Sequence, residues 1–541
     1  MEKRLIAAFS LFTLTAFLLF FRVGILSSED TLAQTAHAQS SYTLTIERTR
    51  GQIYDCRMLP LVGEEQVYTA ACLPLPENSL SLPGLLHMER RDAETLLREG
   101  KPFLAECEPE AGELPGVQVF PVTRRYSDSQ IAQHILGYLD SSGKGVTGVE
   151  KAFEQLLSRS SRESTITYWL DGRGAPLAGT ETSVSLAPTP TAGVVLTIDR
   201  RIQQVAEEVG RELLPRGAIV VMEPSTGKIR ALASFPEYSW SSLEQAVSDG
   251  EGQPLLNRAF LPYNVGSTFK IVTAAAALEQ GLPSSWEYTC DGYIQIVDQV
   301  FRCHDLAGHG ILDLKEALEV SCNPYFIQMG QELDREKLLE TARNFSFGKL
   351  STFAEGFSSS RGNLPAPGEL SSPAALGNLA FGQGTLLATP IQIAQMVCAV
   401  VNGGETPSAS LIEGITENGL LVEERQQSPA PVRAMSPRTA RRLQEYLTSC
   451  VMEVENQRAK PQYVTAGGKT GTAQTGRFKE DGEELLQGWF AGFFPAEEPR
   501  YVVAVLAEDA RSGNQDASPV FREIADRLSA PVVLPPLEEN P

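Results

Sequence analysis

Residues 264–281 read NVGSTFKIVTAAAALEQG, and this stretch decides how the second half of the chain is interpreted. Asn264-Val265-Gly266 has the composition of a turn. The apolar residues that follow recur at helical spacing and predict a helix over 267–280, which a glycine ends. Ser267 and Lys270 would share one face of its first turn. This pair fits a serine nucleophile at a positive helix end beside a lysine base; the alternative is a capping serine with a solvated lysine.

A second short motif, Ser321-Cys322-Asn323, follows a predicted helix over 314–320 and precedes a proline. It therefore lies at a helix junction, where side chains can project into a cleft. The Ser321 hydroxyl would pass protons between Lys270 and a leaving amine, and the Asn323 amide would bind a substrate carbonyl. The alternative is a simple helix stop.

The third motif, Lys469-Thr470-Gly471-Thr472, lies next to a predicted strand. The ammonium group of Lys469 and the two threonine hydroxyls suit a terminal carboxylate, and Gly471 would let a substrate backbone approach closely. The backbone N–H groups of Thr472 and Ser267 would form an oxyanion hole. Lys469 would also act as the second cation that lowers the pKa of Lys270. Alone, the motif also fits a turn with an exposed lysine, but three such motifs in this order favour one catalytic site.

Histidine and cysteine do not indicate a metal or a histidine base in this sequence. His304 and His309 fall in one predicted loop, where we expect a structural role. Among the eight cysteines there is no C-x-x-C motif and no His/Cys cluster along the chain, so we expect no metal and no cofactor. Cys290 and Cys303 flank a strand-like segment over 293–301 and are predicted to form a disulfide; two free thiols are the alternative.

The N-terminus carries a candidate membrane anchor. Lys3 and Arg4 precede an uncharged apolar run over 5–21, which is long for a signal peptide. A cleavage-like Ala36-His37-Ala38 lies well beyond that run, so we favour an uncleaved anchor over a cleaved signal. The basic residues predict a cytoplasmic N-terminus and an extracytoplasmic remainder, with a single span in the cell membrane.

Composition and breaker residues predict the organisation of the chain. At 541 residues it should hold two or three domains, and its net charge of −21 argues against a nucleic-acid partner. A cluster of proline, threonine and glycine over 187–193 marks a boundary. We predict a cytoplasmic stub and anchor over 1–26, a linker over 27–41, a pedestal domain over 42–190, a catalytic domain over 191–530 and a flexible tail over 531–541.

The fold class follows from where the hairpins lie. Strand-like pairs occur at both ends of the second domain, over 218–222 with 228–233 and over 488–494 with 501–507, and helices lie between them. This order predicts an α+β fold, a mostly antiparallel sheet flanked by helices, preceded by a smaller mixed N-terminal domain.

Taken together, the three motifs resemble those of class B penicillin-binding proteins, which carry S-x-x-K, S-x-N and K-T-G in this order. Further segments fit the same family: Arg50-Gly51-Gln52-Ile53-Tyr54-Asp55, Gly137-Tyr138, Gly148-Val149-Glu150, Phe381-Gly382-Gln383-Gly384 with Thr389-Pro390, and Trp489-Phe490-Ala491-Gly492. Two positions depart from the pattern, because Cys322 stands where the second motif often has aspartate and Cys56 stands where arginine often follows the early aspartate.

The resemblance implies a peptidoglycan D,D-transpeptidase that needs neither metal nor cofactor. Ser267 would be the acylated nucleophile and Lys270 its base, with Ser321, Asn323 and Lys469 in the catalytic set. Stem peptides would be the substrates, β-lactams would acylate the same serine, and a polytopic glycan polymerase in the membrane would be the partner. Alternatives are a D,D-carboxypeptidase or β-lactamase with water as acceptor, and a non-catalytic β-lactam sensor or scaffold.

Overall fold

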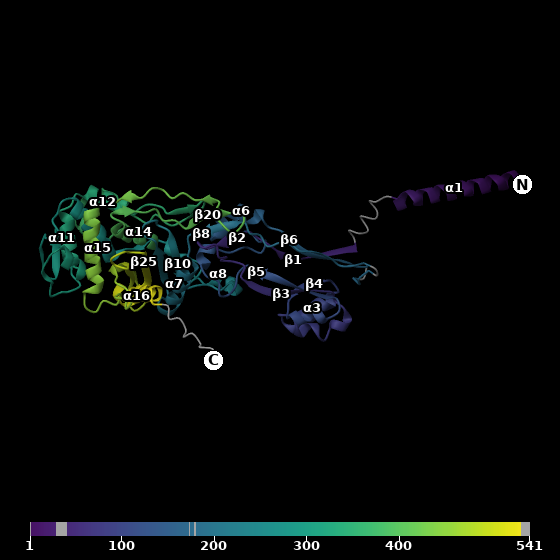
Figure 1. The fold of residues 1–541 in the computed structure, drawn as a ribbon, viewed down its shortest axis with the longest axis horizontal. Helices are drawn as coiled ribbons and strands as arrows, with labels where there is room; N and C mark the ends of the chain where they lie inside the picture. The colour runs from purple at the N-terminus through teal and green to yellow at the C-terminus, as the bar shows by residue number, and fades with distance from the viewer. Residues whose placement is uncertain (1, 29–39, 172–173, 178–179, 532–541) are drawn as a thin grey trace, which may run out of the picture. The chain divides into compact units, whose positions relative to one another are not determined.

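The computed structural model describes residues 2–28, 40–171, 174–177 and 180–531. Most of the predicted linker, the A-x-A segment and nearly all of the predicted tail lie outside the described residues. The chain forms two compact units: residues 1–50, 63–125 and 160–190 form the first, and residues 51–62, 126–159 and 191–541 form the second (Figure 1). Two segments that the sequence assigned to the pedestal, 51–62 and 126–159, thus fold with the second unit.

Helix α1 (Glu2–Ser28) opens the first unit. Among the described residues, its span Glu2–Ser27 is the candidate that is long and apolar enough to cross a membrane. Its large apolar side chains, such as Phe9 and Leu19, are exposed to the surroundings and not packed into a protein core. The predicted apolar run is therefore a helix, and it indicates a membrane anchor.

The remainder of the first unit is mixed, as predicted. It contains two antiparallel sheets, ordered β1-β6-β7 and β4-β3-β5, and one amphipathic helix that ends at a left-handed glycine, Gly100. The elements are β1 (Ser41–Arg48), β3 (Glu65–Cys72), α3 (Arg90–Glu99), β4 (Phe103–Glu106), β5 (Val117–Arg124), β6 (Glu163–Trp169) and β7 (Ser183–Ser185).

An antiparallel five-stranded sheet in the order β10-β9-β25-β24-β23 forms the centre of the second unit. Its strands are β9 (Gly217–Met222), β10 (Ile229–Phe235), β23 (Gly467–Phe478), β24 (Glu484–Phe494) and β25 (Tyr501–Ala510). The two predicted hairpins meet because β25 pairs with β9, with Val503 opposite Val221. This arrangement confirms the α+β prediction, with the antiparallel sheet built from both ends of the unit.

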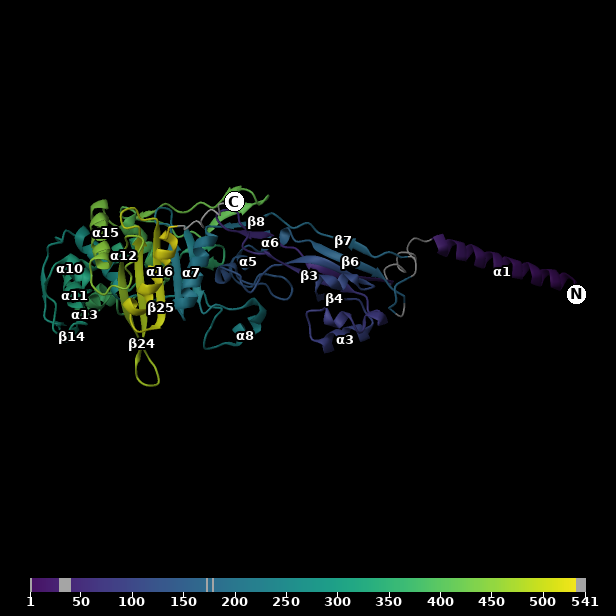
Figure 2. The same cartoon turned by 60° about the horizontal axis from the view of Figure 1, so that its bottom comes forward.

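Helices cover both faces of this sheet. On one face, α7 (Arg200–Leu213) and α16 (Ser518–Ser529) lie side by side (Figure 2). There the ring of Phe521 packs 4.5 Å from that of Phe490 on β24. On the other face lies α14 (Pro390–Val401), which starts with a capping box between Thr389 and Gln392.

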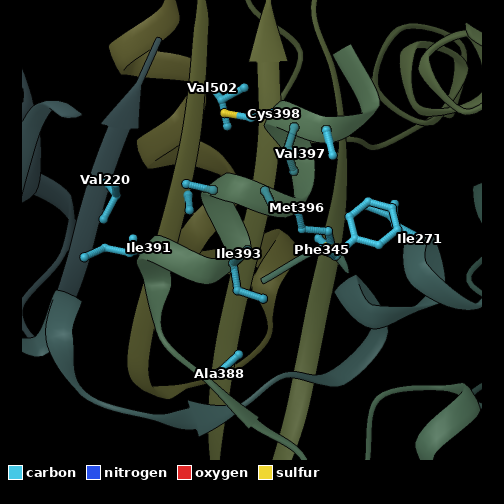
Figure 3. Packing of buried hydrophobic residues seen from close by; sticks show 14 of the residues in the cluster. Val220, Ile271, Phe345, Ala388, Ile391, Ile393, Met396, Val397, Cys398 and Val502 are labelled. Carbon is cyan, nitrogen blue, oxygen red and sulfur yellow. The ribbon is translucent and has the colours of Figure 1, made fainter. Parts of the chain in front are cut away.

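Helix α14 is mostly apolar, and its two glutamines, Gln392 and Gln395, are buried with hydrogen-bond partners. Figure 3 shows its side chains Ile391, Met396 and Val397 between sheet residues such as Val220 and the side chain of Ile271 from another helix. Every residue from 390 to 400 in α14 is buried. A helix with this pattern belongs in a core, and α14 packs there against strands β9, β24 and β25.

The other elements of the second unit include a four-stranded sheet, β2-β8-β20-β21, and several short hairpins. They are β2 (Gln52–Tyr54), α4 (Gln133–Leu136), α5 (Gly148–Ala152), α6 (Glu154–Arg159), β8 (Gly193–Leu196), α8 (Leu243–Ser248), β11 (Tyr263–Asn264), α9 (Lys270–Glu279), β12 (Tyr288–Cys290), β13 (Tyr293–Ile296), β14 (Gln299–Arg302), β15 (Gly310–Leu312), α10 (Leu314–Glu319), α11 (Asn323–Gln331), α12 (Arg335–Asn344), β16 (Thr352–Ala354), β17 (Phe357–Ser358), α13 (Pro373–Ala380), β18 (Leu387–Ala388), β19 (Glu405–Thr406), β20 (Ile412–Thr416), β21 (Glu424–Arg425), β22 (Val432–Arg433) and α15 (Pro437–Met452).

Candidate active site

Ser267 lies in a tight turn that directly precedes helix α9. Residues Gly266–Phe269 form a 3-10 turn, and α9 follows from Lys270, so the α-helix starts three residues later than predicted. The Thr268 hydroxyl donates to the Val265 carbonyl at 3.0 Å, which closes the turn. Ser267 is half-buried while its neighbours are buried, so the turn presents this one side chain toward solvent.

The segment Phe381-Gly382-Gln383-Gly384 supports the turn from behind. The Gly266 N–H donates to the Gly382 carbonyl at 2.8 Å. A Cβ atom on Gly382 would lie 1.9 Å from the Gly266 carbonyl oxygen, so only glycine fits at this backbone contact. The sequence identified this segment through resemblance alone, and the structure shows that it contacts the turn that carries Ser267.

Lys270 is fully buried, and its ammonium group is surrounded by the second motif. Its Nζ donates to the Ser321 carbonyl at 2.7 Å, to Ser321 Oγ at 3.1 Å and to Asn323 Oδ1 at 2.7 Å. It also lies 5.5 Å from the centre of the Phe326 ring. Burial lowers the pKa of Lys270 well below its ordinary value, and the positive charge of Lys469 lowers it further. The solvated-lysine alternative is therefore wrong.

The second motif lies at the predicted helix junction, between α10 and α11. Ser321 has a φ of +54°, a conformation that a residue with a side chain adopts at an energetic cost. This backbone geometry directs both the carbonyl and the hydroxyl of Ser321 at the same lysine nitrogen. The turn is thus shaped for the lysine contacts and is more than a simple helix stop.

Lys469 and the third motif lie in β23, opposite β24. Lys469 is only 3% exposed, so the exposed-lysine alternative is also wrong. Burial lowers the pKa of Lys469, but the shift at Lys270 is the larger of the two and includes the charge of Lys469. The pKa of Lys270 is thus lowered both by burial and by the charge of its neighbour Lys469.

Gly471 lies in a tightly packed position of the protein itself. A Cβ atom there would lie 3.0 Å from Thr268 Cγ2 and 3.2 Å from the Val265 carbonyl oxygen. The sequence predicts a glycine for close approach of a substrate backbone, whereas the structure shows close approach of the turn that carries Ser267. The neighbouring Trp489 indole N–H donates to the Asn264 carbonyl at 2.7 Å, which ties the sheet to the same turn.

Thr470 and Thr472 have different surroundings. Thr470 is half-buried, and Thr472 Oγ1 accepts a hydrogen bond from the Gly513 N–H at 3.1 Å. The Thr472 hydroxyl thus anchors the turn at Gly513–Ala517. Because Thr472 Oγ1 is the acceptor in this bond, its O–H group remains able to donate to a substrate carboxylate, as does that of Thr470.

The structure corrects the expectations for cysteine. All eight cysteines, each of which lies in the described part of the chain, are free thiols, so the predicted Cys290–Cys303 disulfide is absent. Instead, ligand atoms of Cys290, Cys303, His309 and Cys322 all lie within 4.8 Å of one another. We expected no His/Cys cluster because these residues are spaced by 12, 5 and 12 intervening positions. Only the folded hairpins β12 with β15 and β13 with β14 bring them together.

Comparison with known proteins agrees with this geometry. The family model of the penicillin binding protein transpeptidase domain matches residues 217–526. Stage V sporulation protein D of Bacillus subtilis is 28% identical, with 91% of this chain and 80% of that protein covered. Peptidoglycan D,D-transpeptidase PbpA of Mycolicibacterium smegmatis is 29% identical, with 74% of this chain and 83% of the relative covered.

One solved structure matches with a TM-score of 0.68 at 26% identity, and the match covers 99% of both chains. It is described as showing the structural coordination of polymerization and crosslinking by a peptidoglycan synthase complex. The family model begins at β9 and ends within α16. It thus includes the central sheet and all three motifs. This chain therefore belongs to the class B penicillin-binding proteins, the serine-type peptidoglycan D,D-transpeptidases.

Proposed function

We propose that Ser267 is the nucleophile of this transpeptidase, that Lys270 is its base, and that Ser321 carries the proton to the leaving group. The observation that carries this assignment is the environment of Lys270, a fully buried amine hydrogen-bonded to both Ser321 and Asn323. A buried lysine with a strongly lowered pKa is a competent general base near neutral pH. Positioned proton transfer of this kind accelerates a reaction by about 10²- to 10⁴-fold.

In the first step, the neutral Nζ of Lys270 takes the proton from Ser267 Oγ while that oxygen attacks the penultimate D-alanine carbonyl of a donor stem peptide. The new bond joins Oγ to the carbonyl carbon, and the D-Ala-D-Ala peptide bond breaks. Ser321 Oγ, 3.1 Å from Nζ, relays the proton to the leaving D-alanine amine. In the second step, an amine of a neighbouring stem peptide attacks the acyl ester and releases Ser267.

The other motif residues bind the substrate in this proposal. Lys469 and Thr470 hold the terminal carboxylate of the donor, because a buried cation and a half-buried hydroxyl lie side by side on β23. The Asn323 amide binds a substrate carbonyl in addition to its contact with Lys270. The backbone N–H groups of Ser267 and Thr472 stabilise the oxyanion. β-Lactams, which mimic the donor, acylate the same serine.

The apolar helix α1 supports a proposal for where the reaction takes place. We propose a single span with a cytoplasmic N-terminus and an extracytoplasmic catalytic unit, on the basis of Lys3 and Arg4 before the apolar run. A polytopic glycan polymerase in the same membrane is the proposed partner. The likeness over 99% of the chain to a component of a peptidoglycan synthase complex supports it.

The test distinguishes transpeptidation from hydrolysis. The full-length chain is reconstituted with lipid-linked precursor and a glycan polymerase, and the digested product is separated by chromatography, with Ser267→Ala protein as the control. We expect crosslinked dimers with the natural chain and none with the variant. Trimmed monomers without dimers while the polymerase is active would establish a D,D-carboxypeptidase instead. Dimers that persist with the variant would refute the assignment of Ser267.

A further inference from the structure

We propose that Cys290, Cys303, His309 and Cys322 form a Zn²⁺ site that holds the second motif in its active geometry. Three thiol sulfurs and one imidazole nitrogen converge there: Cys290 ends β12, Cys303 and His309 lie at the two ends of the loop between β14 and β15, and Cys322 precedes α11. The binding proposal stands on this cluster alone. The positioning role also rests on the proposed function of Lys270, Ser321 and Asn323.

The size of the cluster fits a tetrahedral zinc ion. Zn–S bonds of about 2.3 Å and Zn–N bonds of about 2.0–2.1 Å place neighbouring ligand atoms about 3.5–3.8 Å apart. Cys303 Sγ lies 3.5 Å from His309 Nδ1, which matches one edge of such a tetrahedron. All four ligand atoms lie within 4.8 Å of one another, so small side-chain movements complete the site.

The backbone around the cluster is built to keep these ligands together. Cys290 pairs with Gly310 across β12 and β15, which brings the adjacent His309 beside it. The Cys303 N–H donates to the Gly292 carbonyl at 2.8 Å. Gly308 has a φ of +83°, and a Cβ atom there would lie 2.2 Å from the Cys290 carbonyl oxygen. The loop that carries His309 therefore passes directly against the strand that carries Cys290.

The chemistry of the ligands favours zinc over a disulfide. One disulfide would use two of the three sulfurs and leave the third thiol beside the imidazole in a buried site. The sulfurs belong to residues that are 0–3% exposed, so they are shielded from water. Thiolate and imidazole ligands in a closed four-coordinate set are typical of structural zinc sites, whereas carboxylate-rich sets suit magnesium or calcium.

The position of Cys322 links the metal to the active site. Cys322 lies between Ser321 and Asn323, the two residues that accept hydrogen bonds from Lys270 Nζ. Ser321 adopts its strained positive φ directly before it, and Cys322 is the N-cap residue of α11. A metal bond to Cys322 Sγ fixes this turn at the residue that lies between the two hydrogen-bond acceptors of Lys270. The zinc ion is thus a positioning element and makes no contact with substrate.

The first test is metal content. The full-length chain, purified in detergent from cells grown with zinc, is analysed by inductively coupled plasma mass spectrometry, and we expect about one zinc per chain. His309→Ala should lose the metal, and His304→Ala should keep it. His304 is a matched control because it is exposed and lies near the same sulfur, 3.9 Å from Cys303 Sγ, but is not among the four ligands.

Two further measurements keep the proposal falsifiable if a variant fails to fold. Chelated natural protein titrated with Co²⁺ should give the visible absorption of a tetrahedral cobalt–thiolate site. The same chelated protein should be acylated by fluorescent penicillin at least about tenfold more slowly, and added zinc should restore the rate. Metal-free folded protein with either free thiols or a Cys303–Cys322 disulfide would overturn the site.

Zinc content can be measured in Ser267→Ala protein, so failure of the acylation proposal would leave the metal result standing. If zinc is bound but its removal leaves acylation unchanged, the positioning role is refuted while the site remains.

Discussion

The contact between Asn323 and Lys270 makes a quantitative prediction for the variant Asn323→Ala. In the structure, Asn323 Oδ1 accepts a hydrogen bond from Lys270 Nζ at 2.7 Å. This acceptor stabilises the charged ammonium more than the neutral amine, so its removal lowers the pKa of Lys270. Because acylation needs the neutral amine, the pH at which the acylation rate reaches half its plateau should move to lower values.

The size of the movement follows from the strength of the hydrogen bond. A bond to a charged group contributes about 1.5–3 kcal/mol and a neutral one about 0.5–1.5 kcal/mol, so the charged form loses about 1–1.5 kcal/mol more. One pH unit corresponds to 1.36 kcal/mol. We therefore expect the acid limb of the acylation profile to shift downward by about one pH unit. The plateau should also fall, because Asn323 is proposed to bind a substrate carbonyl.

The assay measures the rate of acylation by a fluorescent penicillin across a pH series at fixed ionic strength. Gln328→Ala is the control because Gln328 lies in the same helix, α11, and donates to Glu332 on the outer surface. Its acid limb should stay where it is in the natural chain. If the acid limb of the Asn323→Ala profile stays in place or moves to higher pH, the reasoning is refuted. That reasoning holds that Lys270 is the base and that Asn323 favours the charged form of Lys270.

Three other predictions follow from buried groups. Lys469→Met removes the positive charge that lowers the pKa of Lys270, so the acid limb should move upward in the same assay; a downward shift would contradict the coupling. Burial raises the pKa of Glu207 to about 7, so the native state binds more protons than the unfolded state above pH 4.5. The free energy of unfolding, measured with urea, should therefore fall as pH rises toward 7, and Glu207→Gln should flatten this fall. Gly471→Ala forces a methyl group against Thr268 and should cost about 1–3 kcal/mol by thermal unfolding and reduce penicillin labelling, whereas normal labelling would show that the turn relaxes freely.

Much of the second unit is predictable from sequence because its signals are local. Four of the five strands of the central sheet and the helix junction at Ser321 lie where hydrophobic periodicity and breaker residues placed them. The pairing of Ser267 and Lys270 needs only helical spacing. The sequence left a solvated Lys270 open as an alternative, and the structure shows this lysine fully buried at the start of an alanine-rich helix.

Other features depend on long-range contacts that no local pattern reports. Strand β2 pairs in parallel with β8, about 140 positions later, so residues 51–62 join the second unit although the chain continues into the first. The Cys290, Cys303, His309 and Cys322 cluster needs two hairpins to form before its ligands meet. The tight packing at Gly471 comes from Val265 and Thr268, roughly 200 positions earlier. Each of these contacts joins residues that are far apart in the sequence, so no local pattern predicts it.

Identifying the residue that carries the penicilloyl group tests the central claim most directly. The full-length chain is incubated with penicillin, digested, and analysed by tandem mass spectrometry, with Ser267→Ala protein alongside. We predict one adduct, on Oγ of Ser267 within the peptide that contains Lys270, and none in the variant. An adduct on another serine, or labelling that persists in folded Ser267→Ala protein, would contradict the account.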